Sequence, residues 1–298
     1  MRNRRTIAML AATTAGALGL AACSSTEESA AEAPNGDVGE ITLAAVPGWD
    51  DTIASSVLWE AVLEEQGYDV TIEYIDVAPA FIGVSSGTYD LYLGSWLPTT
   101  HGDYYEQYGD DMEVVGVWNR DARNTFAVNA DAPIDSIEDL AENADLFENR
   151  IIGVEAGAGL TRLVEDDVIP TYGLEEMEFV TSSTPAMLAE LDGAMASGDD
   201  ILVTLWQPHW AYGDYDLKNL EDPEGTLGGA EEITILSRTG FADDAPVAHG
   251  WLSDFEMDLD LFATLEAALF QGNETTEYDD QIATWIDENR EWVDTLTP

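Results

Sequence analysis

Two stretches of this chain share one order of elements, and each stretch ends in a Trp-x-Pro tripeptide. The first tripeptide is Trp96-Leu97-Pro98, and the second, Trp206-Gln207-Pro208, begins 110 positions later (206 − 96). Before each tripeptide, short apolar runs alternate with helical patterns as strand, helix, strand, helix, strand. Strands that alternate with helices favour a parallel sheet with helices on both faces. The repetition therefore predicts two α/β lobes.

Apolar runs and the Gly and Pro residues that follow them set the expected boundaries. Strands are expected over 41–46, 70–75, 89–93, 151–154, 178–181 and 201–205, and helices over 51–65, 79–86, 160–169 and 185–196. A strand over 233–237 is expected to return between the lobes, and amphipathic helices over 259–270 and 281–296 to pack on the first lobe. The expected lobes are 40–124 plus 241–298, and 125–240.

Three tryptophans lie where the predicted strands end. Sheets of this kind bind ligands beyond the carboxyl ends of their strands, and Trp49, Trp96 and Trp206 are expected in the loops there. A core tryptophan belongs within an element, as expected for Trp59, Trp118, Trp285 and Trp292. Three rings that converge on a cleft would suit a quaternary ammonium group, which is held by cation–π attraction and apolar contact. From the residues alone, ordinary packing of the three rings is an equally good interpretation.

A carboxylate has candidate partners at the same strand ends. Gly157-Ala158-Gly159 precedes a predicted helix, whose first N–H groups, on Gly159 and Leu160, attract anions. His101, five residues after Trp96, can add a charge-assisted hydrogen bond. The glycine pattern is neither a dinucleotide fingerprint nor a P-loop. With the tryptophans, these residues predict a ligand with a methylated cation at one end and a carboxylate at the other.

Four neighbouring residues have two interpretations each. Asp50 and Asp51 can contact the cation or cap the helix that begins there, and capping is preferred. His209 and Trp210 follow Trp206 so closely that they cannot all face the cleft, so we interpret both as packing residues.

Charge and motif content exclude several function classes. The 60 acidic residues against 10 basic ones give a formal net charge of −50, which repels nucleic acid phosphates. Such a surface is typical of adaptation to high salt, because near 1 M the screening length falls to about 3 Å. The G-x-S-x-G match at 83–87 lacks a preceding strand and a following helix, and the three histidines show no metal-ligand spacing. We expect no catalytic residues, no metal and no cofactor.

The N-terminal residues predict export and lipidation. Arginines precede an uncharged apolar run over 6–20, as in a secretory signal. Leu20-Ala21-Ala22-Cys23 resembles a bacterial lipobox, and Cys23 is the only cysteine in the chain. An ordinary cleaved signal with an incidental cysteine is the alternative. We expect a signal peptide over 1–22, a lipid anchor on Cys23 at the outer face of the cell membrane, and a flexible tether over 23–39.

From about Ile41 to Thr295 the chain resembles the glycine betaine/proline betaine substrate-binding lipoproteins of ABC importers. The resemblance rests on the stretches GWDDTIASSVLWEAVLEEQGYDV, SWLPTTH, AGAGL, LWQPHW and GGAEEITILSRTGF. It implies a two-lobed α/β fold of the periplasmic-binding-protein type (type II), in which each lobe is a mixed, mostly parallel sheet flanked by helices. The ligand is then expected in the cleft between the lobes.

The resemblance also implies roles for individual residues. Trp49, Trp96 and Trp206 would form a cage around the cation, while His101 and the amides of Gly159 and Leu160 would bind the carboxylate. Related choline-binding proteins look similar around the tryptophans but have an acidic residue where His101 stands, which favours a betaine here. The implied function is capture of glycine betaine or proline betaine, as a monomer, for an ABC permease and its ATPase. A choline or carnitine binder, or a lipoprotein sensor, are the alternatives.

Overall fold

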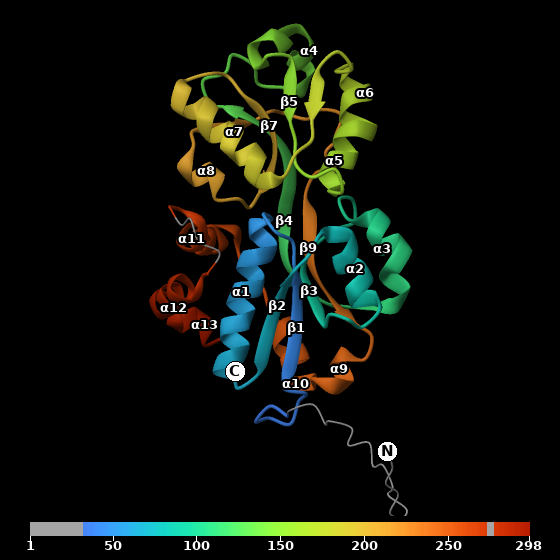
Figure 1. The fold of residues 1–298 in the computed structure, drawn as a ribbon, viewed down its shortest axis with the longest axis vertical. Helices are drawn as coiled ribbons and strands as arrows, with labels where there is room; N and C mark the ends of the chain where they lie inside the picture. Colours follow the sequence, from blue (N-terminus) through green and yellow to red (C-terminus); the bar gives the residue numbers. More distant parts are fainter. Residues whose placement is uncertain (1–31, 273–276) are drawn as a thin grey trace, which may run out of the picture. The chain divides into compact units, whose positions relative to one another are not determined.

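One mixed sheet runs through the residues that the structure describes (Figure 1). This computed structural model describes residues 32–272 and 277–298. Its strands follow the order β2-β1-β3-β9-β4-β7-β5-β6, with β8 (Leu217–Asn219) paired to β4. All of these elements belong to one compact unit, Ala31–Pro298.

Two parallel triplets form the ends of this sheet, as the repeated pattern predicts. The first triplet consists of β1 (Glu40–Ala45), β2 (Asp69–Tyr74) and β3 (Leu91–Leu97). The second consists of β5 (Arg150–Ile152), β6 (Glu178–Val180) and β7 (Leu202–Gln207). Because β3 and β7 run further than expected, Trp96 and Trp206 are the second-last residues of these strands and do not lie in the loops after them.

The triplets are joined by two antiparallel strands, of which the sequence pattern predicts only one. β9 (Glu231–Arg238) is the expected returning strand and pairs with β3. The 18-residue β4 (Met112–Asn129) is unexpected: it pairs with β9 over 112–122 and with β7 over 123–128. Its register against β9 shifts between Val117 and Asn119 and again before Ala122. A strand that passes from one triplet to the other in this way keeps no single buried face, so no alternation marks it.

Helices flank the sheet, and they include the four that the sequence pattern predicts. In the first half they are α1 (Asp50–Glu65), α2 (Val77–Ser85) and α3 (Gly102–Tyr108). In the second they are α4 (Leu140–Asn143), α5 (Gly159–Leu163), α6 (Ile169–Tyr172), α7 (Thr184–Ser197) and α8 (Ala211–Asp214). Helix α7 illustrates how the local sequence sets the ends of a helix. Ser183 accepts a hydrogen bond from the backbone amide of Ala186 at its start, and Gly198, with φ of 74°, ends it.

The C-terminal segment is helical, as expected. It comprises α9 (Phe241–Asp244), α10 (Pro246–Ser253), α11 (Leu259–Phe270), α12 (Asp279–Glu288) and α13 (Arg290–Val293). The single helix expected over 281–296 is wrong, because Asn289 interrupts it with φ of −114°. Helices α11 and α12 both pack on α1 (Figure 1).

The tryptophans expected in the core are there. Trp59, Trp118 and Trp285 are almost fully buried, and Trp292 packs partly buried against the same core. The Trp118 indole N–H donates to the backbone oxygen of Leu93 on β3 at 2.8 Å. These four rings therefore pack in the core, as their positions within predicted elements indicate.

Candidate ligand-binding site

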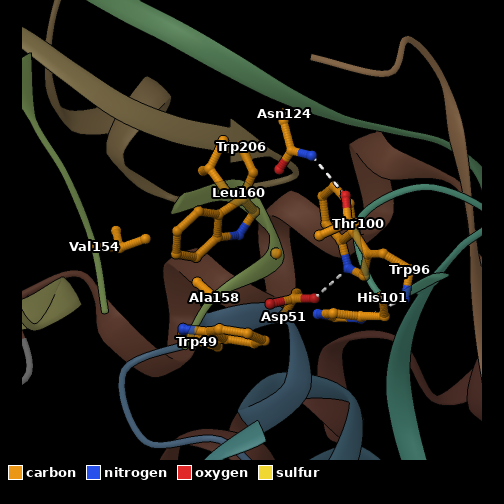
Figure 2. Close-up of a pocket in the computed structure, with 11 residues that line it drawn as sticks. Trp49, Asp51, Trp96, Thr100, His101, Asn124, Val154, Ala158, Leu160 and Trp206 are labelled. Atoms are coloured by element: carbon orange, nitrogen blue, oxygen red, sulfur yellow. Dashed lines mark hydrogen bonds between the residues drawn. The ribbon is translucent and has the colours of Figure 1, made fainter. Parts of the chain in front are cut away.

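A pocket lies where the carboxyl ends of β3 and β7 meet the segments that follow β1 and β5 (Figure 2). All six residues of the predicted site line it, together with Asp51, for which the sequence offered two interpretations, and four residues that the sequence did not single out. The lining residues are Trp49, Asp51, Trp96, Thr100, His101, Asn124, Val154, Ala158, Gly159, Leu160 and Trp206. Predicted site residues separated by up to 157 positions (206 − 49) thus come together in one place.

The three indole rings of the pocket are buried, but their N–H groups differ. The Trp49 indole N–H donates to Glu155 Oε2 at 3.2 Å, and that of Trp96 donates to Asp51 Oδ2 at 2.9 Å. The Trp206 indole nitrogen is buried without a hydrogen-bond partner among the residues that the structure describes. Two rings are therefore oriented by carboxylates, and the third keeps its donor unused.

His101 is a neutral donor that faces this pocket. Its Nδ1 accepts a hydrogen bond from the backbone N–H of Trp96 at 2.9 Å, so the neutral ring carries its proton on Nε2. Burial lowers the pKa of His101 to about 3, and the ring lies flat against Trp49, with 5.6 Å between centroids. Nε2 is buried without a partner in the part of the chain that the structure covers. Any charge in a bond from His101 must therefore come from the ligand.

Asp50 and Asp51 do not cap α1, so the preferred expectation is wrong. The N-cap residue is Trp49, and the two aspartates form the first turn of the helix. Asp51 lies in the pocket and holds Trp96, whereas Asp50 accepts a hydrogen bond from the Trp210 indole N–H. Burial raises the pKa of Asp51 to about 6 and that of Asp50 to about 7. A cation in the pocket would favour the ionised form of both.

A third buried acid lies behind these two. Glu266 on α11 is fully buried, and within residues 32–272 and 277–298 neither of its carboxyl oxygens has a hydrogen-bond partner. Burial, and then the charges of Asp50 and Asp51, raise its pKa well above the ordinary value. Burial therefore favours the neutral form of Glu266.

A buried glutamate holds the turn that carries His101. Glu231 Oε2 accepts hydrogen bonds from the backbone N–H groups of Thr99 and Thr100, each at 2.8 Å, and Oε1 accepts one from the Thr100 hydroxyl. Asn124 Nδ2 then donates to Thr100 Oγ1 at 2.6 Å. With 60 acidic residues in the chain, nothing in the sequence distinguishes Glu231 from its neighbours.

The two halves of the chain touch each other around the pocket. Besides the bond from Trp49 to Glu155, the Tyr104 hydroxyl donates to the Gly157 backbone oxygen at 2.9 Å, and the Arg162 guanidinium lies 3.1 Å from the Asp103 carboxylate. Gly159 is pressed against Thr100, where an added Cβ would lie 1.8 Å from the backbone oxygen. The pocket is thus enclosed by both halves at once.

His209 and Trp210 lie outside the pocket lining. The His209 ring packs edge-on against Trp206, with 4.8 Å between centroids, and its Nδ1 accepts a hydrogen bond from the amide of Ala211. Trp210 is tied to Asp50, as described above. Both residues support the Trp206 end of the pocket from behind.

A family model described as the substrate-binding domain of ABC-type glycine betaine transport systems matches residues 39–288. The chain belongs to this family. Its members are extracytoplasmic transport proteins and not enzymes. The resemblance seen in the sequence is thereby confirmed at the level of the family.

Solved structures of this family share the fold. A glycine betaine/L-proline-binding protein from Borrelia burgdorferi has a TM-score of 0.80 at 32% identity, covering 87% of this chain and 97% of its own. The lactococcal OpuAC protein in its closed form with glycine betaine has a TM-score of 0.80 at 30% identity, covering 87% and 99%. The predicted type II binding-protein fold is confirmed.

A curated relative covers a shorter stretch. The glycine betaine/carnitine transport binding protein of Listeria monocytogenes is 33% identical over 164 residues, which are 54% of this chain and 52% of the relative. The match therefore spans about half the length of that protein.

Two further properties concern only the residues that the structure describes. None of their helices is both long enough and apolar enough to cross a membrane. Their His, Cys, Asp and Glu side chains form no group that could hold a metal ion. The signal peptide and the lipidated Cys23 of the sequence analysis lie outside these residues.

Proposed function

We propose that this chain captures glycine betaine, or a closely related betaine, outside the cytoplasm and delivers it to an ABC permease and its ATPase. Family membership supports the transport role. The observation that carries the choice of ligand is the pocket itself, where Trp49, Trp96 and Trp206 surround one space. The buried Nε2–H of His101 faces this space and has no partner within residues 32–272 and 277–298. Aromatic faces attract a methylated cation, and an unused buried donor favours a ligand with an acceptor oxygen.

The ligand would lie with its two ends in different surroundings. Its trimethylammonium group contacts the indole rings beside the Asp51 carboxylate, and its carboxylate accepts hydrogen bonds from His101 and from the first amides of α5, at Gly159 and Leu160. Those amides have no partner within their own helix. The proposed binding residues are thus the six of the sequence analysis, with Asp51 added.

Choline binding is the second candidate. A choline-binding protein crystallised with choline has a TM-score of 0.77 at 26% identity, covering 86% of this chain. The Asp51 carboxylate in the pocket favours a cation. A hydroxyl in place of the ligand carboxylate would make less use of the His101 donor, and for this reason we prefer the betaine.

His101→Ala tests the choice between these ligands. We expect the variant to lose affinity for glycine betaine by about 10- to 100-fold, because a hydrogen bond to a charged group contributes about 1.5–3 kcal/mol. Its affinity for tetramethylammonium, which has no acceptor, should change by less than about threefold. Isothermal titration calorimetry at molar salt measures both. Tighter binding of choline than of glycine betaine by the wild type, with little effect of the substitution, would favour the choline binder.

Affinity should also depend on pH through the buried aspartates. Asp51 has a raised pKa of about 6 in the free protein, and a bound cation lowers it, so binding releases a proton. We therefore expect affinity for glycine betaine to rise about tenfold from pH 5 to pH 8. His101 and His209, with pKa values of about 3, stay neutral in this window.

The stability of the free protein should change in the opposite direction. Between about pH 4 and 7 the folded chain keeps protons on Asp50 and Asp51 that the unfolded chain has released, so these groups lower the free energy of unfolding as pH rises. Asp51→Asn keeps an acceptor for Trp96 and should reduce both effects. An affinity that is the same in wild type at pH 5 and pH 8 would contradict this linkage.

We also propose the finer organisation that the sequence indicates. The lobes are 40–124 plus 241–298 and 125–240, and they close on the ligand like a hinge. Cys23 carries the lipid that holds the protein, as a monomer, at the outer face of the membrane. The chain has 60 acidic residues against 10 basic ones, which supports adaptation to high salt, where importing a compatible solute is useful.

A further inference from the structure

The three pocket tryptophans differ in what their indole N–H groups do. Carboxylates of Glu155 and Asp51 take up the N–H groups of Trp49 and Trp96. Trp206 is 6% exposed, and in the residues that the structure describes its indole nitrogen is fully buried and unpartnered. Trp49 and Trp96 can therefore offer a ligand only their ring surfaces, whereas Trp206 also has a donor to offer.

The position of this donor distinguishes it from other buried, unpartnered groups. The Trp59 indole nitrogen also lacks a partner among the described residues, but Trp59 does not line this pocket and is packed in the core. Trp206 lines the pocket, and Figure 2 shows its nitrogen on the side of the ring away from Val154, toward Thr100 and Trp96. Among the described residues, His101 offers the other unpartnered side-chain donor of this pocket, from the first half of the chain.

Two unpartnered donors on opposite sides of one pocket cost free energy while no ligand is bound. A buried N–H without a partner costs about 1–3 kcal/mol, which a ligand acceptor recovers on binding. One hydroxyl oxygen has two lone pairs and also needs an acceptor for its own proton, whereas a carboxylate has about four acceptor sites and no proton to place. Donors on both His101 and Trp206 therefore fit a carboxylate better than a hydroxyl.

We propose that Trp206 binds the carboxylate of the ligand through its indole N–H, in addition to offering its ring to the cation. The proposal rests on the proposed function, in that it assumes a betaine in this pocket. It makes Trp206 a residue that determines specificity for the carboxylate, contributed by the second half of the chain as His101 is by the first. The three rings of the cage are then chemically unequal.

Trp206→Phe tests this proposal by calorimetry at molar salt with two ligands, glycine betaine and tetramethylammonium. The variant keeps an aromatic face and removes the donor. We expect it to weaken glycine betaine about tenfold more than it weakens tetramethylammonium. Trp96→Phe is the matched control, because the N–H that it removes is bonded to Asp51, and it should weaken both ligands by factors that agree within about threefold.

The outcomes separate this proposal from the proposed function. Equal weakening of both ligands by Trp206→Phe would overturn the proposal and leave the betaine function in place. Failure of the wild type to bind glycine betaine would overturn the function and the proposal together.

A second readout needs no variant that must fold. In protein labelled with 15N-tryptophan, we expect an indole N–H resonance to move downfield with glycine betaine and not with tetramethylammonium. Identical indole spectra with the two ligands would also overturn the proposal.

Discussion

Gly159→Ala is expected to abolish ligand binding while the protein stays folded. Gly159 begins α5 in the second half of the chain and lies against Thr100 of the first half. An added Cβ would stand 1.8 Å from the Thr100 backbone oxygen and 2.6 Å from its carbon, and neither backbone atom can move aside cheaply. One methyl group would thus keep the halves apart while leaving every ligand-binding group unchanged.

The glycine two positions earlier provides the control for this experiment. An added Cβ at Gly157 meets nothing within 4 Å, so Gly157→Ala should bind glycine betaine like the wild type. Calorimetry measures binding, and thermal unfolding without ligand should give similar midpoints for both variants, because alanine is not worse than glycine at a helix start. Binding by Gly159→Ala at near wild-type affinity would mean that the ligand does not need this close approach.

Trp96→Ala is expected to lower the affinity for glycine betaine and for tetramethylammonium alike, by roughly 30-fold or more. A desolvated cation–π contact contributes about 2 kcal/mol or more, and the substitution removes one of three rings. It also leaves Asp51 without the indole N–H that the carboxylate now accepts at 2.9 Å. Because the cation is common to both ligands, the loss should not distinguish them, unlike the loss in His101→Ala.

A tryptophan outside the pocket provides the comparison for this loss. Trp251 on α10 is half-buried against Tyr68, with 6.3 Å between ring centroids, and lines no part of the pocket. Trp251→Ala should lower the thermal midpoint and leave the affinity within about threefold of wild type. If both substitutions weakened binding equally, the effect of Trp96→Ala would reflect general destabilisation and not the cage.

The repeated pattern in the sequence predicted the two parallel triplets because short strands alternate with helical patterns in the same order twice. The pattern did not predict β4, and the reason is physical. It runs from Met112 to Asn129 and changes partner from β9 to β7 near Ala122, with polar residues where it crosses. Burial along it follows two different surroundings, so it has neither a regular alternation nor a continuous apolar run.

Some residues of the site could be predicted from the sequence pattern, and others could not. The positions of Trp49, Trp96, Trp206 and His101 could be predicted, because aromatic rings at the ends of parallel strands are unusual. Glu155 orients Trp49 by accepting its indole N–H. In a chain with 60 acidic residues, such a partner can be recognised only from its distance to the ring.

The two ends of the folded unit lie at one place on its surface. Pro34 lies against Gly67, where an added Cβ would be 2.8 Å from the proline ring. The Gln66 side-chain Nε2 donates to the Thr297 hydroxyl at 3.3 Å. Both ends therefore meet at the turn that follows α1 (Figure 1). A short peptide could join them, and the chain could be opened instead in an exposed loop such as Glu224–Gly225. Such a circular permutant would begin with β9 and the C-terminal helices and end with β8, and it would keep every strand beside its present neighbour.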